Sequence, residues 1–224
     1  MSPLLIPLAI ILILVGVLFL RTMWKWQEQR TEEFKRISEQ LGMTFSARVK
    51  DRAKDRATPP LPLFGEGHSR VVTNMLHGDS ELLGFAEEFE VRIFAYGFSQ
   101  QQDQHVMQSV ICFQSPQLNL PKFQLRPEHF FDKIGIKLGY QDIDFESHPT
   151  AVEFSKKYLL RGKDEQKIRA LFTDEVLAFF AGQDKVCVEG FSSHLCFYRA
   201  RKLIEPEDIP AFMKEGFEVF RLFT

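Results

Sequence analysis

Residues 89–113 read FEVRIFAYGFSQQQDQHVMQSVICF, and this stretch decides the fold class. Its first eight residues, 89–96, alternate between two sides, as the side chains of a β-strand do. The polar tip SQQQDQ (99–104) then leads to HVMQSVICF (105–113), which predicts a returning strand. We therefore expect an antiparallel hairpin in a half-buried sheet.

Further strands and helices are predicted on both sides of this hairpin. Strand patterns cover residues 69–76 and 152–162, and a short hairpin is expected in 185–199. Helices are expected after Arg126, from Asp164 to Phe172, from Thr173 to Gly182, and over the Phe-rich residues 206–223. The sequence thus predicts an α+β fold with a mainly antiparallel β-sheet and helices packed on one face. With 23 Phe, its core should consist largely of phenyl rings.

The N-terminal segment LLIPLAIILILVGVLFL (4–20) predicts a transmembrane helix, because residues 1–20 carry no charge. Twenty helical residues span about 30 Å, the thickness of the hydrocarbon core of a bilayer. A cleavable signal peptide is one alternative, but it needs a basic start and a small-residue cleavage site. A buried core helix is the other.

The residues after this segment predict its orientation. Arg21 and Lys25 begin a basic flank, and Trp24 and Trp26 lie at the depth of the lipid headgroups. The positive-inside rule then places the N-terminus outside and the C-terminal domain in the cytoplasm. Three scattered cysteines, expected to be free core thiols, agree with a reducing compartment.

Charge divides the chain into a transmembrane anchor (1–20), a basic juxtamembrane segment (21–56) and an acidic α+β domain (57–224), with a possible internal boundary near 116–120. Residues 21–56 carry ten Lys/Arg and six Asp/Glu, whereas 57–224 carry 18 and 24. The acidic domain argues against nucleic-acid binding.

The basic segment and the residues that directly follow it give three separate predictions. A helix is expected from Thr22 to Leu41, with Gly42 as its C-terminal cap. The basic residues of 48–56 would contact anionic headgroups or form a solvated loop. ATPPLPLFGEG (57–67) is expected to be a stiff linker, with a PxxP ligand as the alternative.

The runs KIGIKLGYQDIDFESHP, FSKKYLLRGKDEQKIRALF and EG…LCFYR resemble a group of uncharacterised bacterial single-pass membrane-anchored proteins. The resemblance covers mainly residues 116–224. It implies a bacterial source and an anchored topology, which would place the anchor in the inner membrane of a bacterium. It implies no catalytic or binding residue.

The strongest candidate site is the set Asp142, Asp144, Glu146 and His148. In an extended chain all four side chains would point one way and would offer ligands to a divalent ion. The alternative is a strand edge or loop with a solvated polar face, because Ile143 and Phe145 alternate with these residues. No zinc, nucleotide or hydrolase motif occurs in the sequence, so we expect no cofactor.

Two other surfaces have open interpretations. Lys156, Lys157, Arg161 and Lys163 would bind an anion or headgroup, or form a solvated strand end. The terminal helix is expected to pack on the sheet; a partner groove or a membrane contact is the alternative.

These observations favour a non-enzymatic, membrane-tethered interaction or sensor domain with an unknown protein partner and a lipid bilayer contact through residues 4–20. The alternative is a membrane-surface enzyme or metal-binding protein that uses the Asp142–His148 cluster.

Overall fold

The computed structural model describes residues 5–49, 58–100, 104–128, 140–145 and 149–224, and side chains of the first helix from Leu12 onward. The described strands form one antiparallel sheet in the order β1-β2-β3-β4-β9-β8-β5-β7-β6. The strands are β1 (Thr44–Arg48), β2 (His68–Asp79), β3 (Glu90–Ser99), β4 (His105–Gln114), β5 (Leu120–Pro127), β6 (Gln141–Asp142), β7 (Tyr158–Gly162), β8 (Val186–Ser192) and β9 (His194–Arg199). The predicted α+β class with a large antiparallel sheet is confirmed.

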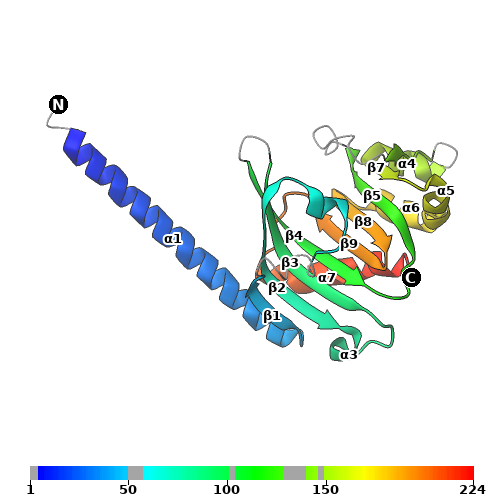
Figure 1. Ribbon diagram of the computed structural model, residues 1–224, viewed down its shortest axis with the longest axis horizontal. Coiled ribbons are helices and arrows are strands. Elements are labelled where there is room, and N and C mark those ends of the chain that lie inside the picture. Colours follow the sequence, from blue (N-terminus) through cyan, green and yellow to red (C-terminus); the bar gives the residue numbers. More distant parts are fainter. Residues whose placement is uncertain (1–4, 50–57, 101–103, 129–139, 146–148) are drawn as a thin grey trace.

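The helices are α1 (Leu5–Gln40), α3 (Ser80–Leu83), α4 (Pro149–Lys157), α5 (Glu165–Leu171), α6 (Asp174–Gly182) and α7 (Ile209–Arg221), with the short 3-10 helices η1 (Pro62–Gly65) and η4 (Pro206–Asp208). Figure 1 shows α1 projecting from the sheet, α7 behind it, and α4, α5 and α6 grouped near β7. The helices predicted from Asp164, from Thr173 and near the C-terminus are confirmed. Pro127 ends β5, and most of the helix predicted after Arg126 lies outside the described residues.

The predicted hairpin is confirmed as β3 and β4, which pair without interruption from Glu90↔Gln114 to Ser99↔His105. The expected half-burial of this sheet is wrong. Val91 and Ile93 face one core cluster with α7, while Phe94 and Tyr96 face a second cluster. Both faces of the central strands are therefore covered.

The second face is covered by residues 58–67, which we call the strap. Leu61, Pro62, Leu63 and Phe64 of the strap are buried against β3, β4 and β9. Figure 1 shows the strap and α7 on opposite faces of the sheet. The prediction that 57–67 is a stiff linker is therefore wrong, because the apolar residues of this segment pack on one face of the sheet.

Phenyl rings fill the core between the sheet and α7, as the composition predicts. The ring centroids of Phe113 and Phe220 are 4.8 Å apart, and those of Phe113 and Phe217 are 5.0 Å apart. Phe212 packs against Phe197 of β9 at 5.5 Å. The expected packing of the terminal helix on the sheet is thus confirmed.

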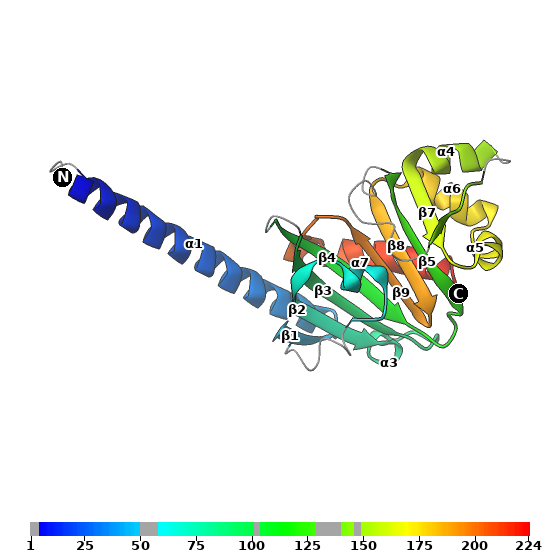
Figure 2. The ribbon, with the colours of Figure 1, turned by 45° about the horizontal axis from the view of Figure 1, so that its top comes forward.

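The helix predicted over residues 22–41 is part of α1. It ends where Gly42 adopts a φ of +69°, and the amide of Met43 donates to the carbonyl of Ser38 at 2.8 Å. Phe34 and Ile37 dock this end of α1 on the main core. The rest of α1 extends away from the domain (Figures 1 and 2).

The prediction of a transmembrane helix is not supported. Within the described part of the chain, no helix combines the length and apolar character that crossing a membrane requires. The predictions of a single-pass signal anchor and of an inner-membrane location are therefore wrong.

Residues 152–162, predicted as one strand, instead form the end of α4 followed by β7. Ala151 and Phe154 of α4 are buried, and their spacing of three residues places them on one side of the helix; Tyr158, which begins β7, is buried too. The rings of Phe154 and Tyr158 are 5.8 Å apart. Within the predicted range, the chain forms a β-strand only from Tyr158 to Gly162.

Cys112 and Cys196, expected to be free thiols, form a disulfide. They lie directly opposite each other in the β4–β9 register, with Cα atoms 4.2 Å apart. Their separation of 84 residues conceals this pairing in the sequence. Cys187 remains a buried thiol, as predicted.

The close approach of α7 to β4 depends on Gly216. A Cβ atom at this position would lie 2.8 Å from Cδ1 and 2.9 Å from Cγ2 of Ile111. We expect Gly216→Ala to lower the free energy of unfolding by about 1–2 kcal/mol, because overpacking exceeds the gain in helix propensity. Urea denaturation measures the change.

The matched control is Gly182→Ala at the end of α6, where no atom lies within 4 Å of the added Cβ. This variant should be neutral or up to about 1 kcal/mol more stable. Equal stabilisation by both substitutions would contradict the proposed helix–sheet packing.

Candidate functional site

A buried polar cluster lies between the sheet and the strap, on the face opposite α7. Its centre is Glu189 of β8, which has no solvent exposure. Gln124 and Arg126 come from β5, Tyr198 comes from β9, and Glu66 comes from the strap. Gln124, Arg126 and Glu189 are all buried.

The strand pattern brings the cluster together. Gln124 and Arg126 share one face because side chains in a strand alternate. Gln124 is the register partner of Glu189, and Tyr198 lies on the next strand of the β8–β9 hairpin. Sequence reasoning missed these residues because each lies in an apolar strand run and its neighbours come from distant segments.

Four donors satisfy the Glu189 carboxylate. Its Oε1 accepts from Gln124 Nε2 at 2.7 Å, Arg126 Nη2 at 2.9 Å and Tyr198 Oη at 2.9 Å. Its Oε2 accepts from the backbone amide of Leu63 at 2.8 Å. Since Leu63 belongs to η1, the buried carboxylate holds the strap on the sheet.

Two arginines fix the end of the strap. Arg126 pairs with Glu66 as well as with Glu189. Arg70 of β2 donates to the carbonyls of Gly65 at 2.8 Å and of Glu66 and Gly67 at 3.1 Å. The strap is therefore a fixed layer of the domain.

Within the cluster, the surroundings of Glu66 disfavour the ionised form of its carboxyl group. Burial, and secondarily the nearby Glu189, raise the pKa of Glu66 above its usual 4.5, against the opposing effect of Arg126. Burial also raises the pKa of Tyr198 well above 10 and that of the Cys187 thiol to about 12. Tyr198 and Cys187 are therefore neutral at physiological pH, which suits a structural role.

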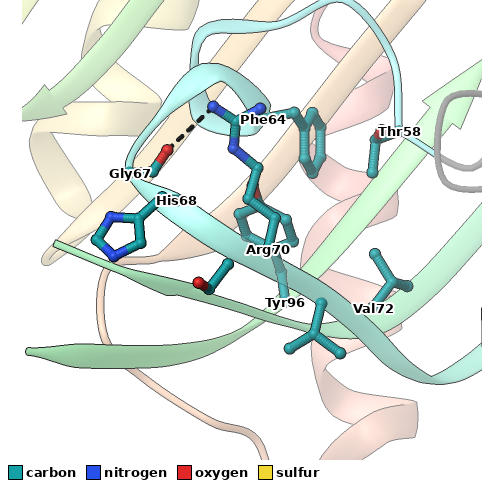
Figure 3. Close-up of a pocket in the computed structure, with 9 residues that line it drawn as sticks. Thr58, Phe64, Gly67, His68, Arg70, Val72 and Tyr96 are labelled. Carbon is teal, nitrogen blue, oxygen red and sulfur yellow. Dashed lines mark hydrogen bonds between the residues drawn. The ribbon is translucent and has the colours of Figure 1, made fainter. Parts of the chain in front are cut away.

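A cleft of about 470 Å³ opens beside the strap. It is lined by Thr58, Phe64, Gly67, His68, Ser69, Arg70, Val71, Val72 and Tyr96. Figure 3 shows Arg70 reaching from β2 toward the carbonyl of Gly67, with the ring of Phe64 beside it. Position 67 requires glycine for two reasons: its φ is +59°, and a Cβ would clash with the carbonyl of Ser99.

The predicted metal-binding set is only partly described. Asp142 lies in β6 and pairs with Arg161 of β7, and Asp144 is exposed. Glu146 and His148 lie outside the described residues. In the described ranges no three His, Cys, Asp or Glu side chains form a metal-binding group. The four-residue site stays a prediction.

The predicted anion-binding lysines lie at the α4–β7 junction. Lys157 Nζ donates to the carbonyl of Ala181 at 2.7 Å, and Lys156 pairs with Glu153 at 2.6 Å. Lys157 also pairs with Asp184 at 3.2 Å, so nearby carboxylates are the partners of both lysines.

The four residues predicted to meet a membrane interface, Arg21, Trp24, Lys25 and Trp26, lie on α1 beyond its contact with the domain. Trp24 is 77% exposed, and the guanidinium of Arg30 lies 5.5 Å from the ring of Trp26. Arg48 of the predicted 48–56 headgroup contact is exposed on β1, and residues 50–56 lie outside the described residues. Both contacts stay predictions.

The architecture defines a class of protein: a long antiparallel sheet with helices on one face, a strap on the other and a protruding N-terminal helix. A solved structure shares this fold: the crystal structure of the mycobacterial trehalose monomycolate transport factor A, TtfA. The TM-score is 0.60 at 11% sequence identity, over 86% of this chain and 91% of that chain. No family model and no curated protein sequence matches.

The raised pKa of Glu66 predicts a pH dependence of stability. A carboxyl group whose pKa is higher in the folded state favours folding most when it is protonated, and this stabilisation is lost as pH rises through the folded pKa. Lowering the pH from 7 to about 4.5 should therefore stabilise the wild type relative to Glu66→Gln. Urea denaturation at several pH values measures this difference.

Exposed Glu218 of α7 provides the control substitution, Glu218→Gln. A wild type that becomes less stable relative to Glu66→Gln on acidification would mean that Arg126 outweighs burial, and would contradict this account.

Proposed function

We propose that this protein is a non-catalytic accessory factor with a membrane-associated role, and that it acts by binding a partner through the protruding part of α1. The observation that carries the proposal is the exposure of apolar side chains there. Leu14, Leu18 and Phe19 are 57–63% exposed, and the other described residues from Leu12 to Leu20 are apolar too.

Such an apolar surface needs a partner. Isolated exposed apolar side chains are ordinary, but a contiguous patch of this kind is typical of an interaction site. The surface is helical and accessible along its length, which suits helix-to-helix packing with another apolar helix. We therefore assign to the partner an apolar helical surface of its own.

The attachment of α1 to the domain supports a binding role. Arg30 is 5% exposed, pairs with Glu205 and donates to the carbonyl of Ile204. Its guanidinium also lies 5.1 Å from the ring of Phe34. A helix held in this way presents its free end in a defined direction, which reduces the entropy lost on binding.

The fold likeness supports the accessory part of the proposal. TtfA is described as a transport factor. By analogy of fold, we propose that this chain likewise assists another assembly, as an interaction domain, and performs no chemistry itself.

The test compares two pairs of substitutions in the full-length chain. Leu14→Glu with Leu18→Glu puts charges on adjacent turns of α1, while Leu82→Glu with Val152→Glu makes the same change at exposed apolar positions of the domain. We expect the first pair to reduce recovery of a stoichiometric partner by at least about tenfold and the second pair to retain it. Quantitative mass spectrometry after crosslinking in cells measures the recovery of the partner. In the reciprocal experiment, purification of the tagged partner must recover this chain.

Equal recovery with both variants, or no stoichiometric partner of the wild type, would contradict the proposal. Circular dichroism must show that each variant is folded like the wild type, so that loss of the partner cannot be due to unfolding.

A further inference from the structure

The disulfide lies where the two halves of the described sheet meet. One half consists of β1 to β4 and the other of β5 to β9, and in the strand order these halves are joined by the pair β4 and β9. Cys112 of β4 and Cys196 of β9 are direct register partners within this pair (Figure 1). The bond therefore links the two halves covalently.

The same bond closes a long loop of the chain. The two cysteines are 84 residues apart, and the interval between them contains β5 to β8 and the helices α4, α5 and α6. Closing a loop of this length restricts the unfolded chain, which stabilises the folded state relative to it. We therefore expect the bond to contribute substantially to the stability of the domain.

The folded domain shields the bond from solution. Cys112 is 4% exposed and Cys196 is not exposed at all, and both belong to the core cluster under the strap. Thiol–disulfide exchange requires a thiolate to reach one of the two sulfur atoms. Because the fold blocks this approach, the environment in which the chain folds decides whether the bond is present.

The third cysteine does not compete for the pairing. Cys187 lies in the same core cluster, where it is the register partner of Tyr198. Burial raises the pKa of its thiol to about 12, so almost none of it is thiolate at neutral pH. The pairing of Cys112 with Cys196 is therefore the stable one in the folded chain.

We propose that the Cys112–Cys196 disulfide is a redox-dependent cross-link between the two halves of the sheet, and that the chain folds in an oxidising compartment, where this bond forms. Disulfides form and persist in such compartments and are rare in a reducing cytosol. The expectation from the sequence, that the cysteines are free and agree with a reducing compartment, is thereby reversed.

The bond forms by exchange with a disulfide of the compartment, carried by a thiol oxidoreductase or by a small oxidised thiol. Cys112 and Cys196 lose their two S–H bonds and form one S–S bond. Two protons and two electrons pass to the disulfide of the oxidant, which becomes two thiols. Reduction of the cross-link is the reverse reaction.

The first test counts free thiols in the full-length chain as it exists in the cells that produce it. Acid quenching fixes the thiol state, and a maleimide–polyethylene glycol reagent then adds a fixed mass to each free thiol of the denatured chain. We expect one free thiol before chemical reduction and three after it. A chain that shows three free thiols before reduction would overturn the proposal.

Two variants identify the pair. Cys187→Ala should show no free thiol before reduction and two after it. Cys112→Ala combined with Cys196→Ala should show one free thiol in both conditions. A free thiol in unreduced Cys187→Ala would mean that the pairing is different, and would overturn the assignment.

The second test measures the cross-link itself, by calorimetry of the purified full-length chain before and after reduction with dithiothreitol. Reduction, verified by the thiol count, should lower the melting temperature of the wild type and of Cys187→Ala by about 5–15 °C. The double alanine variant, which has no bond to lose, should be unaffected.

An equal melting temperature of the oxidised and reduced wild type would overturn the proposed cross-link. The cysteines lie in the core cluster under the strap and not on α1. Failure here therefore leaves the proposed accessory role intact, and the α1 substitutions leave the disulfide intact.

Discussion

The direction of α1 is set where Phe34 and Ile37 pack on the main core and one buried guanidinium, that of Arg30, ties the helix to the domain. Arg30 lies where α1 meets the domain, and it contacts Glu205 and the carbonyl of Ile204, two residues that directly precede η4. Glu205 is half-exposed, so the cost falls on the arginine: removing Glu205 would leave the buried guanidinium without its counter-ion, which is destabilising. The exposed apolar part of α1 is thereby a fixed extension of the folded domain. The proposed binding role depends on this fixed geometry.

A second buried charge organises the opposite part of the molecule. Glu189 joins three strands of the sheet to the strap, through Gln124 of β5, Tyr198 of β9 and the amide of Leu63. The strap in turn forms one wall of the cleft. The exposed surface of α1 and the strap thus both depend on polar contacts between segments that are far apart in sequence.

Local patterns of sequence predict much of the fold. The alternation in 89–113 gives the β3–β4 hairpin, and Gly42 marks the end of α1 as a residue able to adopt positive φ. Asp164 caps α5 by accepting from the amide of Lys167. Each of these features is determined within a few residues, so the sequence is sufficient to predict it.

The remaining features depend on distant partners. The disulfide requires the β4–β9 register, and the burial of 58–67 requires a sheet face formed by β3, β4 and β9. Glu66 and Arg126 become a buried pair only when the strap closes on β5. The prediction of a transmembrane helix was also wrong: it rested on the uncharged N-terminal run, and the described part of the structure does not support it.

The most direct test of the account measures whether α1 is a fixed extension of the domain. Spin labels at Leu18→Cys on α1 and Glu218→Cys on α7 allow their separation to be measured by double electron–electron resonance, and fully buried Cys187 can remain in place. The account predicts one narrow distance distribution for the wild-type background, which broadens in Arg30→Met. A broad or multiple distribution in the wild-type background would contradict the central claim that the domain holds α1 in a defined direction.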